Sequence, residues 1–217
     1  MKTILIINPV VTEGFNQRVA EYLDGLNTGT CRLDVINLKK GPESIETFTD
    51  EIEAGQHILN LIEAYKGGYD AIVINCFADP VVEAAGEISP VPVIGPAQAS
   101  MFLALNLGWK FAVISIYKKS GPWGEIQSRQ YGIIDRMVYS TGIEIPVLEL
   151  EKDPDKTKAE IIKEAEFAVR EKGAEVIVLG CTGMASIARA VQRKLNVPVI
   201  EPLAASVKMA EMILQLK

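Results

Sequence analysis

Short apolar, β-branched runs alternate along the chain with longer stretches whose apolar positions recur at helical spacing. The short runs predict eight strands: Thr3–Ile7, Cys31–Asn37, Ala71–Asn75, Val91–Ile94, Phe111–Ile116, Ile143–Leu148, Val176–Leu179 and Val199–Ile200. The longer stretches predict helices: Asn16–Leu26, Glu51–Tyr65, Val81–Gly86, Ala97–Leu107, Gln127–Tyr131, Lys156–Lys172, Ala185–Lys194 and Ala204–Gln215. Strands that alternate with helices predict an α/β fold with mainly parallel sheets.

Two polar segments with turn-forming residues interrupt this alternation. Gly41–Asp50 contains Gly, Pro, Ser and Thr and predicts a loop. Gly121–Gly124 reads Gly-Pro-Trp-Gly and also predicts a loop, which is a candidate for a lid over a binding site or for a simple turn.

The chain repeats itself once. Residues 72–100 and 177–206 both run from a strand through a cysteine and a helix to Val-Pro-Val-Ile, one further residue and Pro. The separation from the cysteine to Val-Pro-Val-Ile is 15 residues in the first copy and 16 in the second. Two copies are too few for a solenoid, so the repeat predicts two pseudo-symmetric α/β lobes.

Cys76 and Cys181 occupy matched positions at the ends of predicted strands. Ligands of parallel sheets bind beyond the carboxyl ends of the strands, and a following helix favours the thiolate form of a cysteine. A pseudo-dyad would place the two sulfurs on opposite faces of one ligand, in a cleft between the lobes. One thiolate would then take a proton while the other thiol returns one. Cys31 lies inside an alternating strand and is interpreted as a buried structural cysteine.

At these residues the sequence resembles the Asp/Glu/hydantoin racemase superfamily over essentially its whole length. The motifs are Ile7-Asn8-Pro9, Asn75-Cys76-Phe77-Ala78-Asp79-Pro80 and Gly180-Cys181-Thr182-Gly183-Met184. The last two look like the hydantoin and allantoin racemase branch. Amino-acid racemases of the superfamily usually follow the first cysteine with Asn-Thr and the second with Thr-Glu or Thr-His, which Phe77-Ala78 and Gly183 do not match. Members of the hydantoin branch often have Gly where Ala78 stands.

The resemblance implies racemisation of a carbon next to a carbonyl, by two bases and without a cofactor. Cys76 and Cys181 would be the bases. Backbone N–H groups near Phe77-Ala78 and Thr182-Gly183 would hold the carbonyls and the developing enolate, a role that suits donors needing little reorganisation. Asn8 and Pro9 would line the floor of the pocket. Ser115 ends the strand that matches Thr3–Ile7, so we also expect it to face the substrate.

The family pattern implies that the final helix packs back on the first lobe. We therefore expect a first lobe of residues 1–95 plus 201–217 and a second lobe of residues 96–200. The repeat taken alone would put the join nearer Leu107–Gly108. The resemblance also implies a homo-oligomer.

Three further residues have more ordinary interpretations. Asp79 precedes Pro80 and could cap the helix after Cys76 or tune the thiol; Asp before Pro at a helix start favours the capping role. Thr12 either caps the helix that follows it or contacts the substrate. His57 lies in a predicted helix without a motif partner, so we leave it out of the site.

Composition excludes several classes of function. A formal net charge of −6 argues against nucleic acid, because binding phosphates needs clustered Lys and Arg. One histidine, three cysteines and no CxxC argue against a metal site and a disulfide framework. The glycine-rich phosphate motifs are absent, so no nucleotide is expected. The apolar run after Met1 is too short for a signal peptide, and none spans a membrane, so we expect a cytoplasmic protein with a small-molecule substrate.

The leading hypothesis is a racemase of a 5-substituted hydantoin or allantoin. An aspartate- or glutamate-type racemase would need donors for two carboxylates, where the motif surroundings are apolar. A superfamily decarboxylase would use only one of the two cysteines, and a maleate-type isomerase is a further alternative. A non-catalytic small-molecule binding protein would leave the paired cysteines unexplained.

Overall fold

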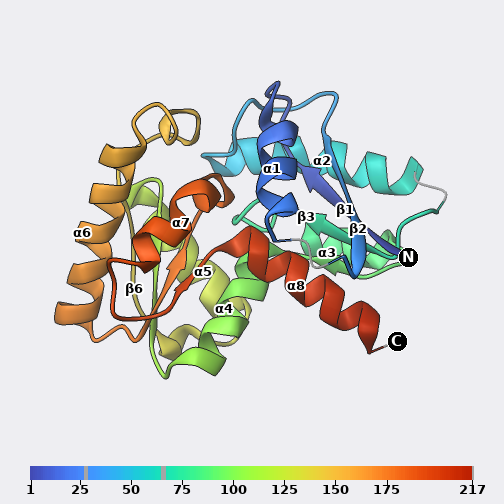
Figure 1. Cartoon of the computed structure of the whole chain (residues 1–217). Coiled ribbons are helices and arrows are strands. Elements are labelled where there is room, and N and C mark those ends of the chain that lie inside the picture. Colours follow the sequence, from blue (N-terminus) through green and yellow to red (C-terminus); the bar gives the residue numbers. More distant parts are fainter. Residues whose placement is uncertain (27–28, 65–66, 217) are drawn as a thin grey trace. The chain divides into compact units, whose positions relative to one another are not determined.

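The computed structural model describes residues 1–26, 29–64 and 67–216 (Figure 1). They form two four-stranded parallel sheets, which confirms the α/β fold with parallel sheets. The chain divides into a first unit, Met1–Pro96 with Leu203–Lys217, and a second unit, Ala97–Pro202. The expected boundaries, at residues 95/96 and 200/201, lie within two residues of this division.

The first unit is built around a sheet with the order β2-β1-β3-β4. Its strands are β1 (Lys2–Asn8), β2 (Cys31–Asn37), β3 (Ala71–Ile74) and β4 (Val93–Ile94). Its helices are α1 (Phe15–Asp24), α2 (Phe48–Ala64), α3 (Val82–Ile88) and α8 (Pro202–Gln215). Alternate residues of β1 and β3 pack with Ile58 and Ile62 of α2, which explains why these strands are apolar throughout. The last residue predicted for α2, Tyr65, lies outside the described residues.

The second unit has the equivalent strand order, β6-β5-β7-β8. Its strands are β5 (Phe111–Ser115), β6 (Met137–Gly142), β7 (Val176–Leu179) and β8 (Val199–Ile200). Its helices are α4 (Pro96–Leu107), α5 (Gly121–Gln130), α6 (Pro154–Lys172) and α7 (Ala185–Gln192), with short 3-10 turns at Lys118–Ser120, Ile134–Arg136, Val147–Glu149 and Thr182–Met184. Local sequence sets the ends of α6: Asp153 accepts a hydrogen bond from the Lys156 N–H, and Gly173 ends the helix with a left-handed backbone.

The last helix of each repeat belongs to the other unit. Helix α4 follows β4 in sequence but packs on α5, where the Ser128 hydroxyl lies 3.7 Å from Met101 Sδ and the rings of Phe102 and Tyr131 are 6.3 Å apart. Helix α8 follows β8 but belongs to the first unit, where the Thr30 hydroxyl donates to Glu211. The join suggested by the repeat alone, near Leu107–Gly108, therefore falls after the helix that changes unit.

The predicted strand Ile143–Leu148 is wrong. The strand next to β5 is Met137–Gly142, a half-buried edge strand whose Tyr, Ser and Thr hide the apolar alternation. Ile143 and Ile145 are apolar because they pack into the core from the segment beyond this strand. Glu144 between them has a φ of 58°, so the backbone cannot continue as a strand.

The predicted loop at Gly121–Gly124 is also wrong, because these residues form the first turn of α5. Pro is compatible with a first helical turn. A Cβ on Gly121 would lie 2.8 Å from the Ser140 carbonyl oxygen, and a Cβ on Gly124 would overlap the Ser140 hydroxyl. The two glycines therefore let α5 approach β6 closely, which is a packing role and not that of a lid hinge.

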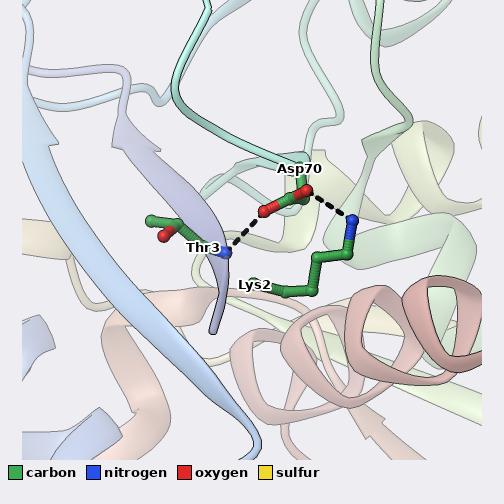
Figure 2. Close-up of polar contacts among 3 residues, drawn as sticks. All are labelled: Lys2, Thr3 and Asp70. Carbon is green, nitrogen blue, oxygen red and sulfur yellow. Dashed lines mark hydrogen bonds and ion pairs between the residues drawn. The ribbon is translucent and has the colours of Figure 1, made fainter.

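An ion pair fixes the beginning of β1. Figure 2 shows the Asp70 carboxylate between the Lys2 ammonium and the Thr3 N–H, each 2.8 Å from a carboxylate oxygen. The hydrogen bond from Lys2 and that from Thr3 hold the pKa of Asp70 below its usual range. Asp70 directly precedes β3, so this contact ties the beginnings of two neighbouring strands together.

Asp70→Asn is expected to lower stability at pH 7, with a loss that shrinks as the pH falls. The carboxylate of the folded protein binds protons less tightly than that of the unfolded chain, so its stabilisation is present above the unfolded pKa, about 4, and is lost below it. Urea midpoints of both proteins at pH 7, 5 and 3 measure this. A difference that stays constant across these pH values would contradict the role of the Asp70 charge.

None of the helices in the described part of the chain combines the length and apolar character needed to cross a membrane.

Candidate active site

Cys76 lies two residues after the carboxyl end of β3, at the edge where ligands of parallel sheets bind. The Asn75 N–H donates to the Ile7 carbonyl at 2.8 Å, and the Cys76 N–H donates to the Ile74 carbonyl at 2.7 Å. The thiol is half-buried and packs against the core of the first unit. The first of these hydrogen bonds holds Asn75 against β1, and the second closes a tight turn between Ile74 and Cys76.

A chain of side-chain amides crosses the same edge of the first sheet. Asn75 Nδ2 donates to Asn8 Oδ1 at 2.7 Å, Asn8 Nδ2 donates to Asn37 Oδ1 at 2.9 Å, and Asn37 Nδ2 donates to the Thr12 carbonyl at 2.8 Å. Asn8 and Asn75 are 0% and 2% exposed. Asn8 was predicted as a site residue and Asn37 was not, although one signal was present: Ile-Asn ends β1 and β2, at residues 7–8 and 36–37, and recurs at residues 74–75, where β3 ends at Ile74.

Thr12 does not cap the helix that follows it. The N-cap position of α1 is Gly14, without a side-chain cap hydrogen bond. The Thr12 hydroxyl donates to the Glu43 carbonyl, so it ties the loop after β1 to the loop after β2. The carbonyl of Thr12 in turn anchors the amide chain.

Cys181 occupies the equivalent place in the second unit, two residues after β7. The Gly180 N–H donates to the Ile114 carbonyl at 2.7 Å, as Asn75 does to Ile7. The Gly183 N–H donates to Cys181 Sγ at 3.3 Å, within the turn Thr182–Met184. An N–H donor of this kind favours a negatively charged sulfur over a neutral thiol.

The polar surroundings of the two cysteines differ. Ser115 stands where Asn8 stands in the first unit, and Gly180 stands where Asn75 stands. The Ser115 hydroxyl donates to the Gly180 carbonyl at 2.9 Å. Cys76 thus comes directly after a residue of the amide chain, whereas Cys181 comes directly after a residue whose carbonyl accepts from a serine hydroxyl.

Of the remaining predicted residues, Pro9 follows the end of β1, Phe77 and Ala78 follow Cys76, and Thr182 and Gly183 follow Cys181. Pro9, Phe77 and Thr182 are buried, whereas Ala78 and Gly183 are half-buried. Within the first unit the structure brings Asn8 and Cys76 to one sheet edge, and within the second unit it brings Ser115, Cys181 and Gly183 to one sheet edge. His57 lies in α2, where its Cδ2 would be 3.6 Å from a Cβ placed on Gly41.

The prediction that Asp79 caps the helix after Cys76 is wrong. The N-cap residue of α3 is Val81, without a side-chain cap hydrogen bond. Asp79 has a φ of 51°, and its buried carboxylate fills the space beside Gly95, next to the end of β4. This left-handed turn over Asp79 and Val81 separates the cysteine from the helix.

Each repeat has a buried carboxyl group between its cysteine and the residue after its last strand, but at positions that do not correspond in sequence. Asp79 corresponds to Met184 in the second copy, whereas Gly95 corresponds to Glu201. Asp79 and Glu201 are both buried. The acid therefore comes from the cysteine loop in the first unit and from the residue after β8 in the second unit.

Glu51, in the first turn of α2, belongs to the acidic surroundings of Asp79. Burial, followed by the charges of Asp50 and Asp79, raises the pKa of Glu51 to about 7. The Asp50 carboxylate itself accepts hydrogen bonds from the N–H groups of Glu46 and Thr47.

Glu51→Gln is expected to stabilise the protein increasingly as the pH rises. Between the unfolded pKa, about 4, and the folded pKa, about 7, the folded protein retains a proton that the unfolded chain has released, so wild-type stability falls through this window. The difference in Tm, variant minus wild type, should grow from pH 5 to pH 8. Glu53→Gln, on the exposed side of α2, is the matched control. A difference that is the same at both pH values would contradict the burial of Glu51.

Metal ligands do not gather in the described ranges 1–26, 29–64 and 67–216: no three His, Cys, Asp or Glu side chains there are grouped so as to hold a metal ion.

Comparison with known proteins agrees with this geometry. The model of the family described as Asp/Glu/Hydantoin racemase matches residues 4–210. The chain is 37% identical to a hydantoin racemase of Rhizobium meliloti over 212 residues, which cover 97% of this chain and 88% of the relative. It is 33% identical to a hydantoin racemase of a Pseudomonas species, over 98% of this chain and 86% of the relative.

A solved structure with the same fold is that of allantoin racemase from Klebsiella pneumoniae. It superposes with a TM-score of 0.94 at 31% sequence identity, over 100% of this chain and 89% of that chain. Two α/β units with a thiol after the third strand of each, together with these relatives, define the class as an isomerase of the racemase type. The chain belongs to the Asp/Glu/hydantoin racemase family.

Proposed function

We propose that this protein racemises a 5-substituted hydantoin, a class that includes allantoin, with Cys76 and Cys181 as its two bases and without a cofactor. The observation that carries the proposal is the matched position of the thiols, each two residues beyond the carboxyl end of the third strand of its sheet. The named activities of the relatives supply the substrate class.

The reaction is a proton exchange at C5 of the hydantoin ring. The thiolate of one cysteine takes the C5 proton, and the electron pair of the C–H bond moves into the neighbouring C4 carbonyl to give an enolate. The thiol of the other cysteine then gives its proton to the opposite face of C5 as the carbonyl reforms. The products are the mirror-image hydantoin and a protein with thiol and thiolate exchanged, so the reverse reaction starts from that protein.

Backbone N–H groups near Phe77-Ala78 and Thr182-Gly183 are proposed to hold the ring carbonyls and the enolate oxygen. The Gly183 N–H illustrates how such binding of a substrate oxygen can depend on whether the thiol is protonated. It donates to Cys181 Sγ in the structure, but a neutral thiol is a weak acceptor, so the N–H can turn to the substrate oxygen when Cys181 carries the proton. Asn8, Pro9 and Ser115 are proposed to line the substrate site.

We also propose that the protein is a homo-oligomer, which light scattering of the purified protein tests.

The experiment is a proton-exchange assay in D₂O. Enantiopure allantoin and a set of 5-alkyl and 5-aryl hydantoins are incubated with reduced enzyme, while optical rotation and the C5 proton signal are followed. The expected result is loss of rotation together with deuterium uptake, above the uncatalysed rate measured without enzyme. Activity on aspartate, glutamate or maleate, but on no hydantoin, would overturn the substrate class. Silence on all of them would favour a binding protein.

A further inference from the structure

In the chain of amides at the edge of the first sheet, every hydrogen bond is donated in the same direction, from Asn75 toward Thr12, and Asn37 sets this direction. We propose that Asn37 is a positioning residue for Cys76: anchored on the Thr12 carbonyl, it orients the amides of Asn8 and Asn75 and thereby holds the 75–76 peptide. The catalytic part of this inference rests on the proposed function, whereas the positioning of the thiol does not.

The direction follows from the chemistry of the anchor. A backbone carbonyl only accepts hydrogen bonds, so Asn37 must turn its Nδ2 toward Thr12, and its Oδ1 is left to accept from Asn8. Asn8 must then present Oδ1 to Asn75, whose Nδ2 donates to it. Turning over any one of the three amides would bring two N–H groups or two oxygens face to face.

Burial makes the orientation of the amides near Cys76 costly to disturb. Asn8 and Asn75 are almost completely excluded from water, and a buried polar group that loses its partner bears its full desolvation cost. Asn37 is only half-buried, at the end of edge strand β2. It can therefore be replaced without opening the core.

The link to the cysteine runs through Asn75. Its N–H bonds to Ile7 and its side chain bonds to Asn8, so both its main chain and its amide are fixed on β1. Cys76 is the next residue, and its own N–H bonds to Ile74. A loosened Asn75 amide would thus free rotation of the peptide that carries the Cys76 thiol.

The second unit offers an internal comparison. The residues equivalent to Asn8 and Asn75 are Ser115 and Gly180, joined by a single hydroxyl-to-carbonyl hydrogen bond. Loss of Asn37 should therefore affect Cys76 and leave Cys181 unchanged.

The test measures the reactivity of each thiol separately. The wild type, Asn37→Leu and Asn37→Thr are treated with iodoacetamide over a range of pH, and alkylation of Cys76 and Cys181 is followed by peptide mass spectrometry. Leucine keeps the size of asparagine without its polar atoms, whereas threonine keeps a hydroxyl that can accept from Asn8. Asn60→Ala, on the exposed face of α2, is the control. Thermal unfolding checks that all variants are folded.

The expected result is a change of about two- to tenfold in the alkylation rate of Cys76 in Asn37→Leu, the range that one net hydrogen bond corresponds to. Asn37→Thr should lie between Asn37→Leu and wild type, and Cys181 should react alike in all four proteins. An unchanged Cys76 rate in Asn37→Leu, or equal changes at Cys76 and Cys181, would overturn the inference.

The same variants are then assayed on the substrate that the wild type racemises. We expect Asn37→Leu to lower kcat more than it raises KM, because Asn37 acts on the base through Asn75 and is not itself among the residues proposed to line the substrate site. A wild type that is inactive on every substrate would defeat the proposed function alone, since the alkylation rates are measured without substrate. Altered KM with unchanged kcat would contradict a positioning role.

Discussion

Replacing either Cys76 or Cys181 by serine is expected to lower racemisation by roughly 10²–10⁴-fold, the usual contribution of one acid–base group. A serine hydroxyl neither releases its proton near neutral pH nor takes one from carbon. Inversion needs one group on each face of C5, so the loss of either should stop it. The initial rate of change in optical rotation of an enantiopure hydantoin measures the effect.

Cys31→Ser is the matched control for both variants. Cys31 is buried at the amino end of β2, the end of the strand opposite to that at which Asn37 lies. Burial, followed by the charge of Glu211, raises the pKa of the Cys31 thiol, as expected of an inert structural cysteine. We expect racemisation close to that of the wild type, with some loss of stability from the buried hydroxyl. Loss of activity comparable to that of the other two variants would contradict the assignment of the bases.

Gly95→Ala is expected to destabilise the protein by about 1–3 kcal/mol, the usual cost of overpacking. A Cβ at this position would lie 2.7 Å from Asp79 Oδ1 and closer still to Asp79 Oδ2 and Cγ. Asp79 cannot easily move away, because it is buried in a left-handed turn. The strain should therefore reach the loop that carries Cys76, and urea unfolding measures it.

A double-mutant cycle separates this clash from other effects of the substitution. Asp79→Ala removes the three atoms nearest to the new Cβ, so Gly95→Ala should cost much less in the Asp79→Ala background than in the wild type. Gly86→Ala in α3 is the control, because its Cβ meets no atom within 4 Å, and we expect it to be neutral or stabilising. If the costs of Gly95→Ala and Asp79→Ala simply add, the proposed contact between these residues is wrong.

The sequence was sufficient to predict those features that depend on apolar patterning and on the repeat. Cys31–Asn37, Val176–Leu179 and Val199–Ile200 were predicted with the bounds they have in the structure. These strands are short, apolar or alternating, and bounded by turn residues. Their parallel arrangement followed from the helices between them.

The features that the sequence did not predict depend on tertiary packing. The polar edge strand Met137–Gly142 is stabilised by pairing with β5, which a local pattern cannot show. The glycines of Gly121–Gly124 indicated a turn, but they are needed because α5 lies close to Ser140. Asp79 stood where a capping residue is expected, but the space beside Gly95 accommodates its carboxylate instead.

The candidate site was predictable only where the repeat or the matching strands mark its residues. The two cysteines were found because the repeat marks them, and Asn8 and Ser115 because they end matching strands. Asn37 was missed because the recurring Ile-Asn pairs gain meaning only when β2 is known to lie beside β1, which brings the amides of Asn8 and Asn37 together. No sequence spacing connects Asn37 with Cys76.

The most direct test of the two-base account follows deuterium exchange at C5 for each enantiomer separately, with Cys76→Ser and Cys181→Ser. In each variant the remaining thiol can still remove and return a proton on its own face. We predict that Cys76→Ser exchanges the proton of one enantiomer only, that Cys181→Ser exchanges that of the other only, and that neither inverts its substrate. Exchange of the same enantiomer by both variants, or of both enantiomers by either one, would contradict the assignment of one thiol to each face.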